Sequence, residues 1–264
     1  MSESNGSKPP ARPDPGSWVL RVAATADVHA RPNRVDELRA GFERVNDEAD
    51  LLLIAGDLTS VGTPDEAATL AEACALIEIP VIAVLGNHDW HSNRRDEVVA
   101  TLDEAGVQVV DPGHRILSIR GVDVGVVGVK GFVGGFPGSH LPDFGEPLLR
   151  QVYAEAEREV EALDHGLRSV AQCPLRLVVM HYAPIEATLA GEPREIFAFL
   201  GCDRLAGPIL EHEPDLVVHG HAHSGTFEGS AGNVPVFNAS VEVTGRPYWV
   251  FEVTPATTSA SAIH

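Results

Sequence analysis

The sequence predicts an α/β protein, and two observations support that prediction. Between Trp18 and Ala105, short segments that are almost entirely apolar alternate with segments of helical periodicity. This alternation is typical of parallel strands that helices cover on both faces. The composition is that of a globular chain, with 264 residues of which 44% are hydrophobic and 22% charged. We find no linker and no internal repeat, so we expect one domain over residues 17–254, with a disordered arm at 1–16 and a flexible tail at 255–264.

The first part of the chain predicts three strand–helix units. Each apolar run is followed by a segment that places apolar residues on one helical stripe. The strands are expected at 18–24, 51–55 and 80–85, and the helices at 35–48, 63–78 and 94–105. Thr63, Pro64 and Glu66 form a helix-start signature, with a capping threonine, a proline in the first turn and a glutamate three residues after the cap. We expect Asn93 to cap the third helix and Gly106 to end it.

After residue 106 the pattern changes. Short apolar segments separated by glycine-containing turns predict an antiparallel hairpin among strands at 107–110, 115–119 and 122–129. The later elements are helices at 146–170 and 206–213, and strands at 175–180, 215–218, 225–228, 234–238 and 248–253. The glycine-rich loop from Lys130 to Gly145 is long for a compact domain. It suits a lid over a cleft, and the alternative is a surface loop that packs Phe132 and Phe136 onto the core.

Polar residues able to bind metal ions follow five of the predicted strands. They are Asp27 and His29, then Asp57, then Asn87, His88 and Asp89, then His181, and finally His221 and His223. In open α/β sheets, ligands bind beyond the carboxyl ends of the strands, so we expect these residues to converge. The glycines at positions 56, 86 and 220 permit sharp turns and a close approach to bound ions.

The residue types indicate a site for two divalent ions. Imidazole, carboxylate and amide oxygen without thiolate argue against a cysteine-rich structural zinc site, and favour Mn, Fe or Zn over Mg. Two ions about 3.5–4 Å apart need a bridging carboxylate, because it offsets their mutual repulsion. We interpret Asp57 as that bridge. Asp27 and His29 lie two residues apart in what we expect to be extended chain, so their side chains would point the same way and reach one ion.

Four further polar residues lie near these motifs. His219 is expected to pack beside the last motif, and Asn238 is a candidate for supporting the ligands from behind. His91 and His140 are candidates for lining the substrate pocket.

Taken together and in this order, the motifs Asp27-x-His29, Gly56-Asp57, Gly86-Asn87-His88-Asp89, His181 and Gly220-His221-x-His223 resemble those of the calcineurin-like metallophosphoesterases. The resemblance implies a four-layer α/β/β/α sandwich with two facing mixed β-sheets. It implies one ion held by Asp27, His29, Asp57 and His223, and another held by Asp57, Asn87, His181 and His221. His88 would lie beside the substrate, donating a hydrogen bond to the phosphoryl group and a proton to the leaving oxygen. Asp89 is the next residue in the sequence and is a candidate for orienting His88.

The implied enzyme is a metal-dependent phosphoric ester hydrolase, and the expected substrate is a small phosphate ester, in the first place a phosphodiester or cyclic nucleotide. A water that bridges two ions has a lowered pKa, so it can attack phosphorus as hydroxide near neutral pH. Gly56-Asp57 continues as Leu-Thr-Ser-Val-Gly, without the Asp-Arg pair of the Ser/Thr protein phosphatase branch, which argues against that activity. Two alternatives stay open: a phosphomonoesterase acting on a small metabolite, and a non-catalytic scaffold like the retromer subunit of this superfamily.

Charge and hydropathy argue against several partners. The chain has 19 basic and 38 acidic residues and a net charge of −19, which disfavours duplex nucleic acid and weakens the alternative of a DNA-repair nuclease. The sequence has no apolar run of 18 or more residues that would predict a membrane span, and no apolar signal segment. The three scattered cysteines, Cys74, Cys173 and Cys202, fit reduced thiols in the cytoplasm. The oligomeric state is not predicted.

Overall fold

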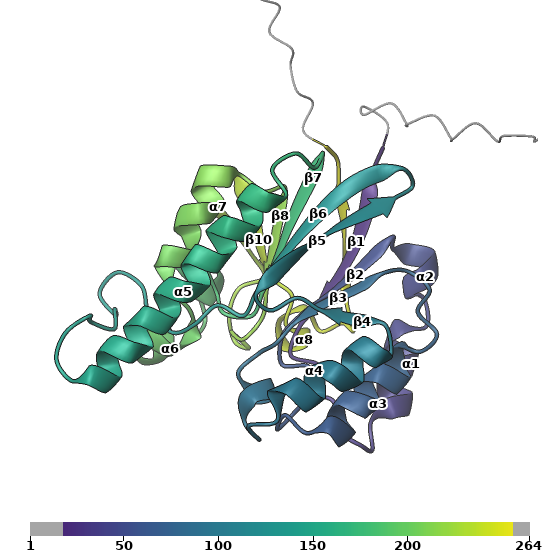
Figure 1. Ribbon diagram of the computed structural model, residues 1–264, viewed down its shortest axis with the longest axis horizontal. Helices are drawn as coiled ribbons and strands as arrows, with labels where there is room; N and C mark the ends of the chain where they lie inside the picture. Colours follow the sequence, from purple (N-terminus) through teal and green to yellow (C-terminus); the bar gives the residue numbers. More distant parts are fainter. Residues whose placement is uncertain (1–17, 256–264) are drawn as a thin grey trace, which may run out of the picture.

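Two mixed β-sheets pack face to face, and helices cover the outer face of each (Figure 1). The computed structural model describes residues 18–255. The arm expected at 1–16 lies outside the described residues, and so does the expected tail except for residue 255. The predicted α/β class and the four-layer arrangement with two facing mixed sheets are confirmed.

The first sheet has the strand order β11-β1-β2-β3-β4. Its strands are β1 (Leu20–Thr25), β2 (Leu51–Ala55), β3 (Val81–Val84), β4 (Val107–Val109) and β11 (Trp249–Val253). All neighbours are parallel except β11, which pairs antiparallel with β1. The helices that follow these strands are α1 (Val35–Phe42), α2 (Val45–Glu48), α3 (Pro64–Cys74) and α4 (Arg95–Glu104). Every residue of β2 and β3 is buried, as expected for strands covered on both faces.

The second sheet has the strand order β5-β6-β7-β8-β10-β9. Its strands are β5 (Gly113–Ile119), β6 (Val122–Val129), β7 (Leu175–Met180), β8 (Leu216–His219), β9 (Glu228–Ala231) and β10 (Val234–Asn238). The predicted antiparallel hairpin is β5–β6, whereas β4 pairs parallel with β3 and completes the first sheet. The outer helices are α5 (Pro147–Ser169) and α7 (Ala206–His212), and the two short helices are α6 (Phe197–Leu200) and α8 (Val241–Thr244).

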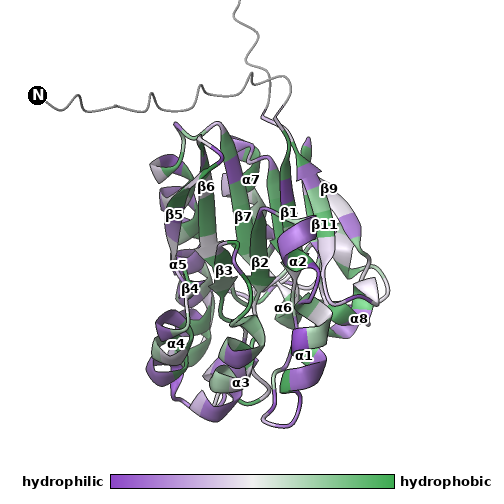
Figure 2. Ribbon diagram, turned by 90° about the vertical axis from the view of Figure 1, so that its right-hand side faces the viewer, coloured by the Kyte–Doolittle hydropathy of each residue, from purple (hydrophilic) through white to green (hydrophobic). Residues whose placement is uncertain are grey.

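The hydrophobic core has three layers that match this architecture. The central layer lies between the sheets and includes Leu53 of β2, Val126 of β6 and Phe251 of β11. Two outer layers lie between each sheet and its helices. In Figure 2 the strands are mostly green and the helices carry purple residues, which is the amphipathic pattern that buries one helical stripe. No helix within residues 18–255 is long and apolar enough to cross a membrane.

Several predicted boundaries are wrong, and local hydrogen bonds explain two of them. The helix expected at 63–78 ends at Cys74, because the Asn46 side chain donates to the carbonyl of Leu76 and accepts from the amide of Glu78. The strand expected at 225–228 begins instead at Glu228, because the amide of Thr226 donates to the carbonyl of Thr188.

Two further boundaries differ in the helices. The helix expected at 35–48 is two helices, α1 and α2. Asn93 has a positive φ of 57°, and Arg94 takes the capping position without a side-chain hydrogen bond. The short helical segments between residues 186 and 205, and helix α8, were not predicted.

Candidate metal centre

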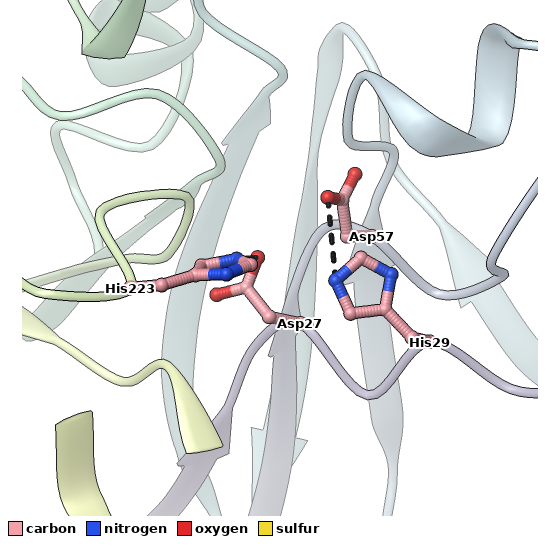
Figure 3. Close-up of side chains that lie close together, drawn as sticks. All are labelled: Asp27, His29, Asp57 and His223. Carbon is pink, nitrogen blue, oxygen red and sulfur yellow. Dashed lines mark ion pairs between the residues drawn. The ribbon is translucent and has the colours of Figure 1, made fainter. Parts of the chain in front are cut away.

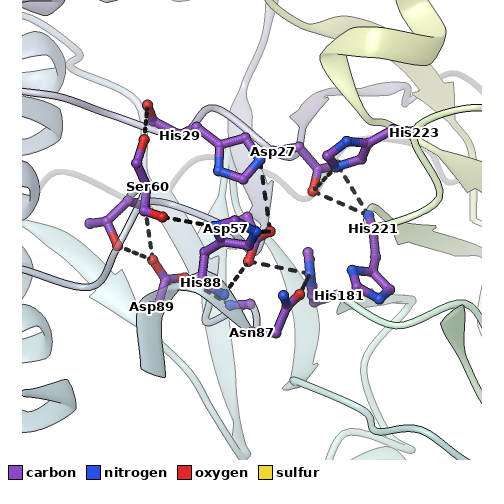
Figure 4. Close-up of polar contacts among 12 residues, drawn as sticks. Asp27, His29, Asp57, Ser60, Asn87, His88, Asp89, His181, His221 and His223 are labelled. Atoms are coloured by element: carbon purple, nitrogen blue, oxygen red, sulfur yellow. Dashed lines mark hydrogen bonds and ion pairs between the residues drawn. The ribbon is translucent and has the colours of Figure 1, made fainter. Parts of the chain in front are cut away.

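The predicted ligands come together where the carboxyl ends of the two sheets meet (Figure 4). Asp27 and His29 follow β1, Asp57 follows β2, Asn87 follows β3, His181 follows β7, and His221 and His223 follow β8. Backbone hydrogen bonds fix these loops to one another. The amide of His29 donates to the carbonyl of Asp57 over 3.0 Å, and the amide of Gly220 donates to the carbonyl of His181 over 3.1 Å. The amide of His221 donates to Oδ2 of Asp27 over 3.1 Å and joins the two pairs of loops into one frame.

Two groups of donor atoms share one carboxylate. Asp27, His29, Asp57 and His223 (Figure 3) offer donor atoms that all lie within 4.8 Å of one another, and so do Asp57, His181 and His221. Asp57 belongs to both groups, which is the geometry that a bridging ligand requires. The Oδ1 atom of Asn87 lies 2.9 Å from Nε2 of His181, beside the second group. These are the two ligand sets that the family resemblance implies.

The backbone is strained at these ligands. Among the described residues, seven non-glycine residues have a positive φ, and four of them are Asp27 (59°), His29 (42°), Asp57 (49°) and His221 (70°). Such angles cost of order 1–3 kcal/mol each and cluster at functional sites. The expectation that Asp27 and His29 lie in extended chain is wrong, because both residues have left-handed angles. Their side chains converge on Asp57 through this turn and not through strand alternation.

Glycines leave the room that the carboxylates need. A Cβ atom at Gly86 would lie 2.0 Å from Oδ1 of Asp57, and one at Gly220 would lie 2.7 Å from Oδ2 of Asp27. A Cβ atom at Gly56 would lie 2.4 Å from Nδ1 of His181. Any larger residue at these positions would displace a donor group.

Hydrogen bonds behind the imidazoles select the nitrogen that faces the site. Nδ1 of His181 lies 3.0 Å from the carbonyl of Ala55, which leaves Nε2 toward Asn87 and Asp57. Nε2 of His221 lies 3.0 Å from the carbonyl of Phe199, which leaves Nδ1 for a metal ion. Partners of this kind fix the tautomer and orientation of metal-binding histidines.

Two residues behind the ligands make the contacts expected of them. Asn238 is buried, and its Nδ2 donates to the carbonyl of Ala222 over 2.7 Å, which holds the loop between His221 and His223. His219 is buried and its Nε2 lies 2.8 Å from Oγ1 of Thr188, so it packs beside the motif as predicted.

The charges of the site fit divalent cations. Asp27 and Asp57 are each 1% exposed, and their ion pairs within residues 18–255 are with histidines only. Burial lowers the pKa of His181 to about 4 and that of His221 to about 3, so both are neutral at pH 7, the form that binds metal. Burial and the charge of Asp27 raise the pKa of Asp57. A hydrogen bond to Asp27 raises the pKa of His223 to about 9, so His223 is a cation that pairs with Asp27. Asp57 pairs with no lysine or arginine within residues 18–255, and metal ions would supply the missing charge.

His88 lies beside the centre, and its ring is held by Ser60, a residue that the sequence did not indicate. Its Nδ1 lies 2.7 Å from the carbonyl of Ser60, and its Nε2 lies 3.8 Å from Oδ2 of Asp57. The side chain is 43% exposed, so the ring faces the space that a substrate would enter.

The expectation that Asp89 orients His88 is wrong. The Asp89 carboxylate accepts hydrogen bonds from the amides of Leu58, Thr59 and Gly86, because the adjacent side chains diverge. Asp89 therefore ties together the loops that follow β2 and β3, and the carbonyl of Ser60 orients His88.

Two cavities adjoin the centre. One has a volume of about 260 Å³ and is lined by Asn87, Trp90, Lys130, Phe132, Glu155 and Tyr182. The other has a volume of about 500 Å³, and its lining includes Asp27, His29 and three arginines, Arg31, Arg34 and Arg246. His91 and His140 are not among the described residues that line either cavity, and His140 instead pairs with Asp203 at 2.8 Å.

One part of the loop from Lys130 to Gly145 lies at the site, and another part packs onto the core. Phe136 is fully buried and packs with Phe197 and with Ala222 of the last ligand motif. Phe132 instead lines the smaller cavity, with its ring centroid 6.0 Å from that of Tyr182. Tyr182 in turn lies 4.5 Å from His221, between their ring centroids. The start of the loop therefore lies at the site, and its middle belongs to the core.

Comparison with known proteins identifies the family and supports the fold. The model of the calcineurin-like phosphoesterase family matches residues 20–225. The phosphopantetheinyl hydrolase from Mycobacterium tuberculosis is similar in structure, with a TM-score of 0.64 and 18% identity over 90% of this chain and 97% of that one. The protein TT1561 of Thermus thermophilus has a TM-score of 0.57 and 18% identity over 89% and 99% of the two chains.

A third similar structure is GAP50, described as the anchor in the inner membrane complex of Plasmodium. It has a TM-score of 0.53 and 12% identity over 85% of this chain and 72% of that one. A search of curated proteins found no match.

Proposed function

The chain belongs to the calcineurin-like phosphoesterase family of metal-dependent phosphoester hydrolases, and on that premise we propose that it hydrolyses a phosphodiester or cyclic nucleotide at a centre of two divalent ions. We assign Asp27, His29, Asp57 and His223 to one ion, and Asp57, Asn87, His181 and His221 to the other. The oxygen and imidazole donors favour Mn, Fe or Zn. The buried free cysteines Cys74, Cys173 and Cys202 support a place in the reducing cytoplasm.

The observation that carries this proposal is the shared carboxylate. Asp57 is common to both donor groups, its backbone has a positive φ, and glycine at position 86 leaves room for its oxygen. A carboxylate at a simple turn would need none of these features. Two ions bound here would activate a water molecule and take up the negative charge that develops on the phosphoryl oxygens.

The chain's own residues supply orientation and a proton. His88 is exposed toward the substrate space, and the carbonyl of Ser60 accepts from Nδ1, which leaves Nε2 to act. When His88 is protonated, Nε2 can donate to a phosphoryl oxygen and pass its proton to the leaving oxygen. The frame built by Asp89 holds the loops of Asp57 and His88 at a fixed separation.

A phosphodiester fits the surroundings of the centre better than a phosphomonoester. The smaller cavity reaches the centre at Asn87 and the larger one at Asp27 and His29. Figure 4 shows Asn87 and His29 on different sides of Asp57. A diester has two substituents that could enter the two cavities, whereas a monoester has one. The alternative of a small-metabolite phosphomonoesterase is consistent with the family and is one arm of the substrate test below.

The second alternative is a non-catalytic scaffold, since GAP50 shows that a similar fold is found in a protein described as an anchor. This chain has all seven expected ligand residues and His88 at the centre, in strained loops that a scaffold would not need. We therefore favour an active enzyme.

The decisive test is His88→Ala in the Mn-loaded protein. We expect two ions per chain and a loss of about 10²–10⁴-fold in turnover of bis-p-nitrophenyl phosphate, the range for a lost general acid. His91→Ala is the matched control, because His91 is exposed nearby and lines neither cavity. Unchanged turnover in His88→Ala would remove His88 from the mechanism. A parallel screen of phosphomonoesters, phosphodiesters and cyclic nucleotides decides the substrate class.

A further inference from the structure

The larger of the two cavities gathers positive charge in a strongly acidic protein. The whole chain has 19 basic and 38 acidic residues, yet Arg31, Arg34 and Arg246 all line this cavity, together with the ligand residues Asp27 and His29. Arg31 follows the first ligand motif, and Arg246 follows helix α8 near the other end of the chain. The fold, and not the local sequence, brings these arginines to one cavity beside the metal centre.

Two of the three arginines have no carboxylate partner among the described residues. Arg34 is neutralised, because its Nε and Nη2 atoms donate to both carboxylate oxygens of Glu37. Within residues 18–255, Arg31 donates only from Nε, to Oγ of Ser60 over 2.9 Å. The guanidinium of Arg246 lies over the ring of Trp249, 4.8 Å from its centroid, and makes no ion pair within residues 18–255. The terminal nitrogens of Arg31 and Arg246 can therefore serve a ligand.

The acidic residues of the cavity leave Arg31 and Arg246 without a paired carboxylate within residues 18–255. Glu37 is occupied by Arg34. Glu242 accepts a hydrogen bond from Oγ of Ser240 over 2.8 Å and lines the same cavity. Arg31 and Arg246 thus face two remaining carboxylates, Glu242 and the ligand Asp27. Metal ions held by Asp27 and His29 would offset the charge of Asp27 and make the cavity positive.

A chain of hydrogen bonds connects this cavity to His88. Oγ of Ser60 accepts from Arg31 and donates to the carbonyl of His29, and the carbonyl of Ser60 faces Nδ1 of His88. A group bound at Arg31 would therefore be positioned relative to a phosphoryl group beside His88. Arginine is suited to this task, because its planar fork matches phosphate and carboxylate oxygens.

We propose that this cavity binds a second anionic group of the substrate, a phosphate or carboxylate on one ester substituent, through Arg31 and Arg246. The inference rests on the proposed function, since it deepens the substrate class of the same site. The natural substrate is then a phosphodiester with one anionic arm, and neutral diesters are poor substitutes for it.

Binding of three small ligands to the Mn-loaded protein tests the inference without turnover. Ethyl phosphate carries no second anion, phosphoglycolate carries a carboxylate, and ethane-1,2-diol bisphosphate carries a second phosphate. By calorimetry we expect at least one of the two ligands that carry a second anionic group to bind about tenfold or more tightly than ethyl phosphate, the scale of a charge-assisted contact. The stronger of the two identifies the anion.

Arginine variants locate the contact. Arg246→Gln is expected to reduce the preference for a ligand with a second anion over ethyl phosphate to about threefold or less. It should leave the binding of ethyl phosphate unchanged, since only the second anion contacts this side chain. Arg31→Gln should also weaken the preference. Arg150→Gln, an exposed arginine on α5 that lines neither cavity, is the matched control and should retain the full preference. Equal binding of all three ligands by the unmodified protein, or a full preference in Arg246→Gln, would overturn the inference.

Turnover separates this inference from the proposed function. Ethyl p-nitrophenyl phosphate and 2-phosphoethyl p-nitrophenyl phosphate release the same leaving group and differ only in the anionic arm. Hydrolysis of both at equal kcat/KM would support the phosphodiesterase proposal and refute the proposal that the cavity binds an anionic arm of the substrate. Hydrolysis of neither, with the binding preference intact, would refute the phosphodiesterase proposal and leave the anion site standing.

Discussion

Two clusters of buried charge in this protein balance their charges differently. At the end of β6, Lys130 is 6% exposed and its Nζ lies 3.4 Å from Oε1 of Glu159, which is 7% exposed. At the ends of β1 and β2, Asp27 and Asp57 are buried among histidines, with no lysine or arginine pairing with them within residues 18–255. The first cluster includes a lysine, whereas the second has only histidines, of which His223 pairs with Asp27 as a cation and Asp57 is left for cations from solution.

The backbone shows the same contrast. Asp27 and Asp57 have left-handed φ angles of 59° and 49°, and no such angle is found at Lys130 or Glu159. Lys130 also lies over the rings of Phe132 and Tyr182, 4.4 and 5.6 Å from their centroids, as a packed cation does. Buried charge by itself therefore does not mark a metal site. Carboxylates that have no lysine or arginine partner, lie among histidines and are held in strained turns are typical of one.

The largest effect is expected from Asp57→Ala, which removes the carboxylate common to both donor groups. We expect metal analysis to find fewer than two ions per chain, and turnover to fall by about a thousandfold or more, because bound ions contribute several kcal/mol to stabilising the transition state. Lys130→Met is the control from the other cluster and should keep both ions. Two ions per chain in Asp57→Ala would refute the bridging assignment.

Lys130→Met should lower the free energy of unfolding and leave metal binding intact. It leaves Glu159 buried without its cation, which typically costs about 3–5 kcal/mol. Urea unfolding would measure this loss in the free energy of unfolding. The double variant Lys130→Met with Glu159→Leu should regain much of it, since neither charge remains.

The matched control for Lys130→Met is Arg158→Met, which breaks the exposed pair with Glu155. Such surface pairs contribute about 0–1 kcal/mol. Equal losses in the Lys130 and Arg158 variants would contradict the view of Lys130 and Glu159 as a self-compensated buried pair.

Removal of metal ions should destabilise the protein at the cluster of Asp27 and Asp57. A ligand present at a hundred times its dissociation constant stabilises the folded state by about 2.7 kcal/mol, so dialysis against a chelator should lower the urea midpoint by a corresponding amount. Addition of Mn²⁺ should restore it. The shift should vanish in Asp57→Ala and persist in Lys130→Met. A chelator effect of the same size in Asp57→Ala would place the stabilising ion elsewhere.

The smallest expected effect is a slope in the pH dependence of stability. Burial and the charge of Glu159 raise the pKa of Asp111 to about 7, against a usual value of 3.8. The folded state therefore keeps a proton that the unfolded chain releases. The stability contributed by this carboxyl group is fully present below pH 3.8 and is lost as pH rises through about 7.

Asp111→Asn tests that slope, because asparagine does not titrate. The difference in unfolding free energy between the natural chain and this variant should change between pH 4 and 7, with the natural chain losing stability relative to the variant as pH rises. Glu252→Gln, an exposed acid on β11, should give a constant difference. A constant difference for Asp111→Asn as well would mean that Asp111 is ionised throughout this range.

The ligand residues could be predicted because their signal is local. Each one stands directly after an apolar strand, and strand identity follows from runs such as Leu51 to Ala55. Parallel strands place their carboxyl ends at one edge of a sheet, so convergence within each sheet followed from the pattern, and the facing of the two sheets followed from the family resemblance. The role of Asp89 could not be predicted in this way. Its carboxylate accepts from amides in two other loops, and no spacing in the sequence indicates those partners.

By itself, the sequence determined the fold class, the family and the residues that we propose as ligands of two ions, because apolar periodicity and donor chemistry are properties of short segments. Only the tertiary structure decided which charges are compensated. Lys130, at the end of β6, pairs with Glu159 on α5. Arg31 and Arg246 line one cavity from distant parts of the chain. Pairing and burial of charge depend on distances between segments, which packing sets.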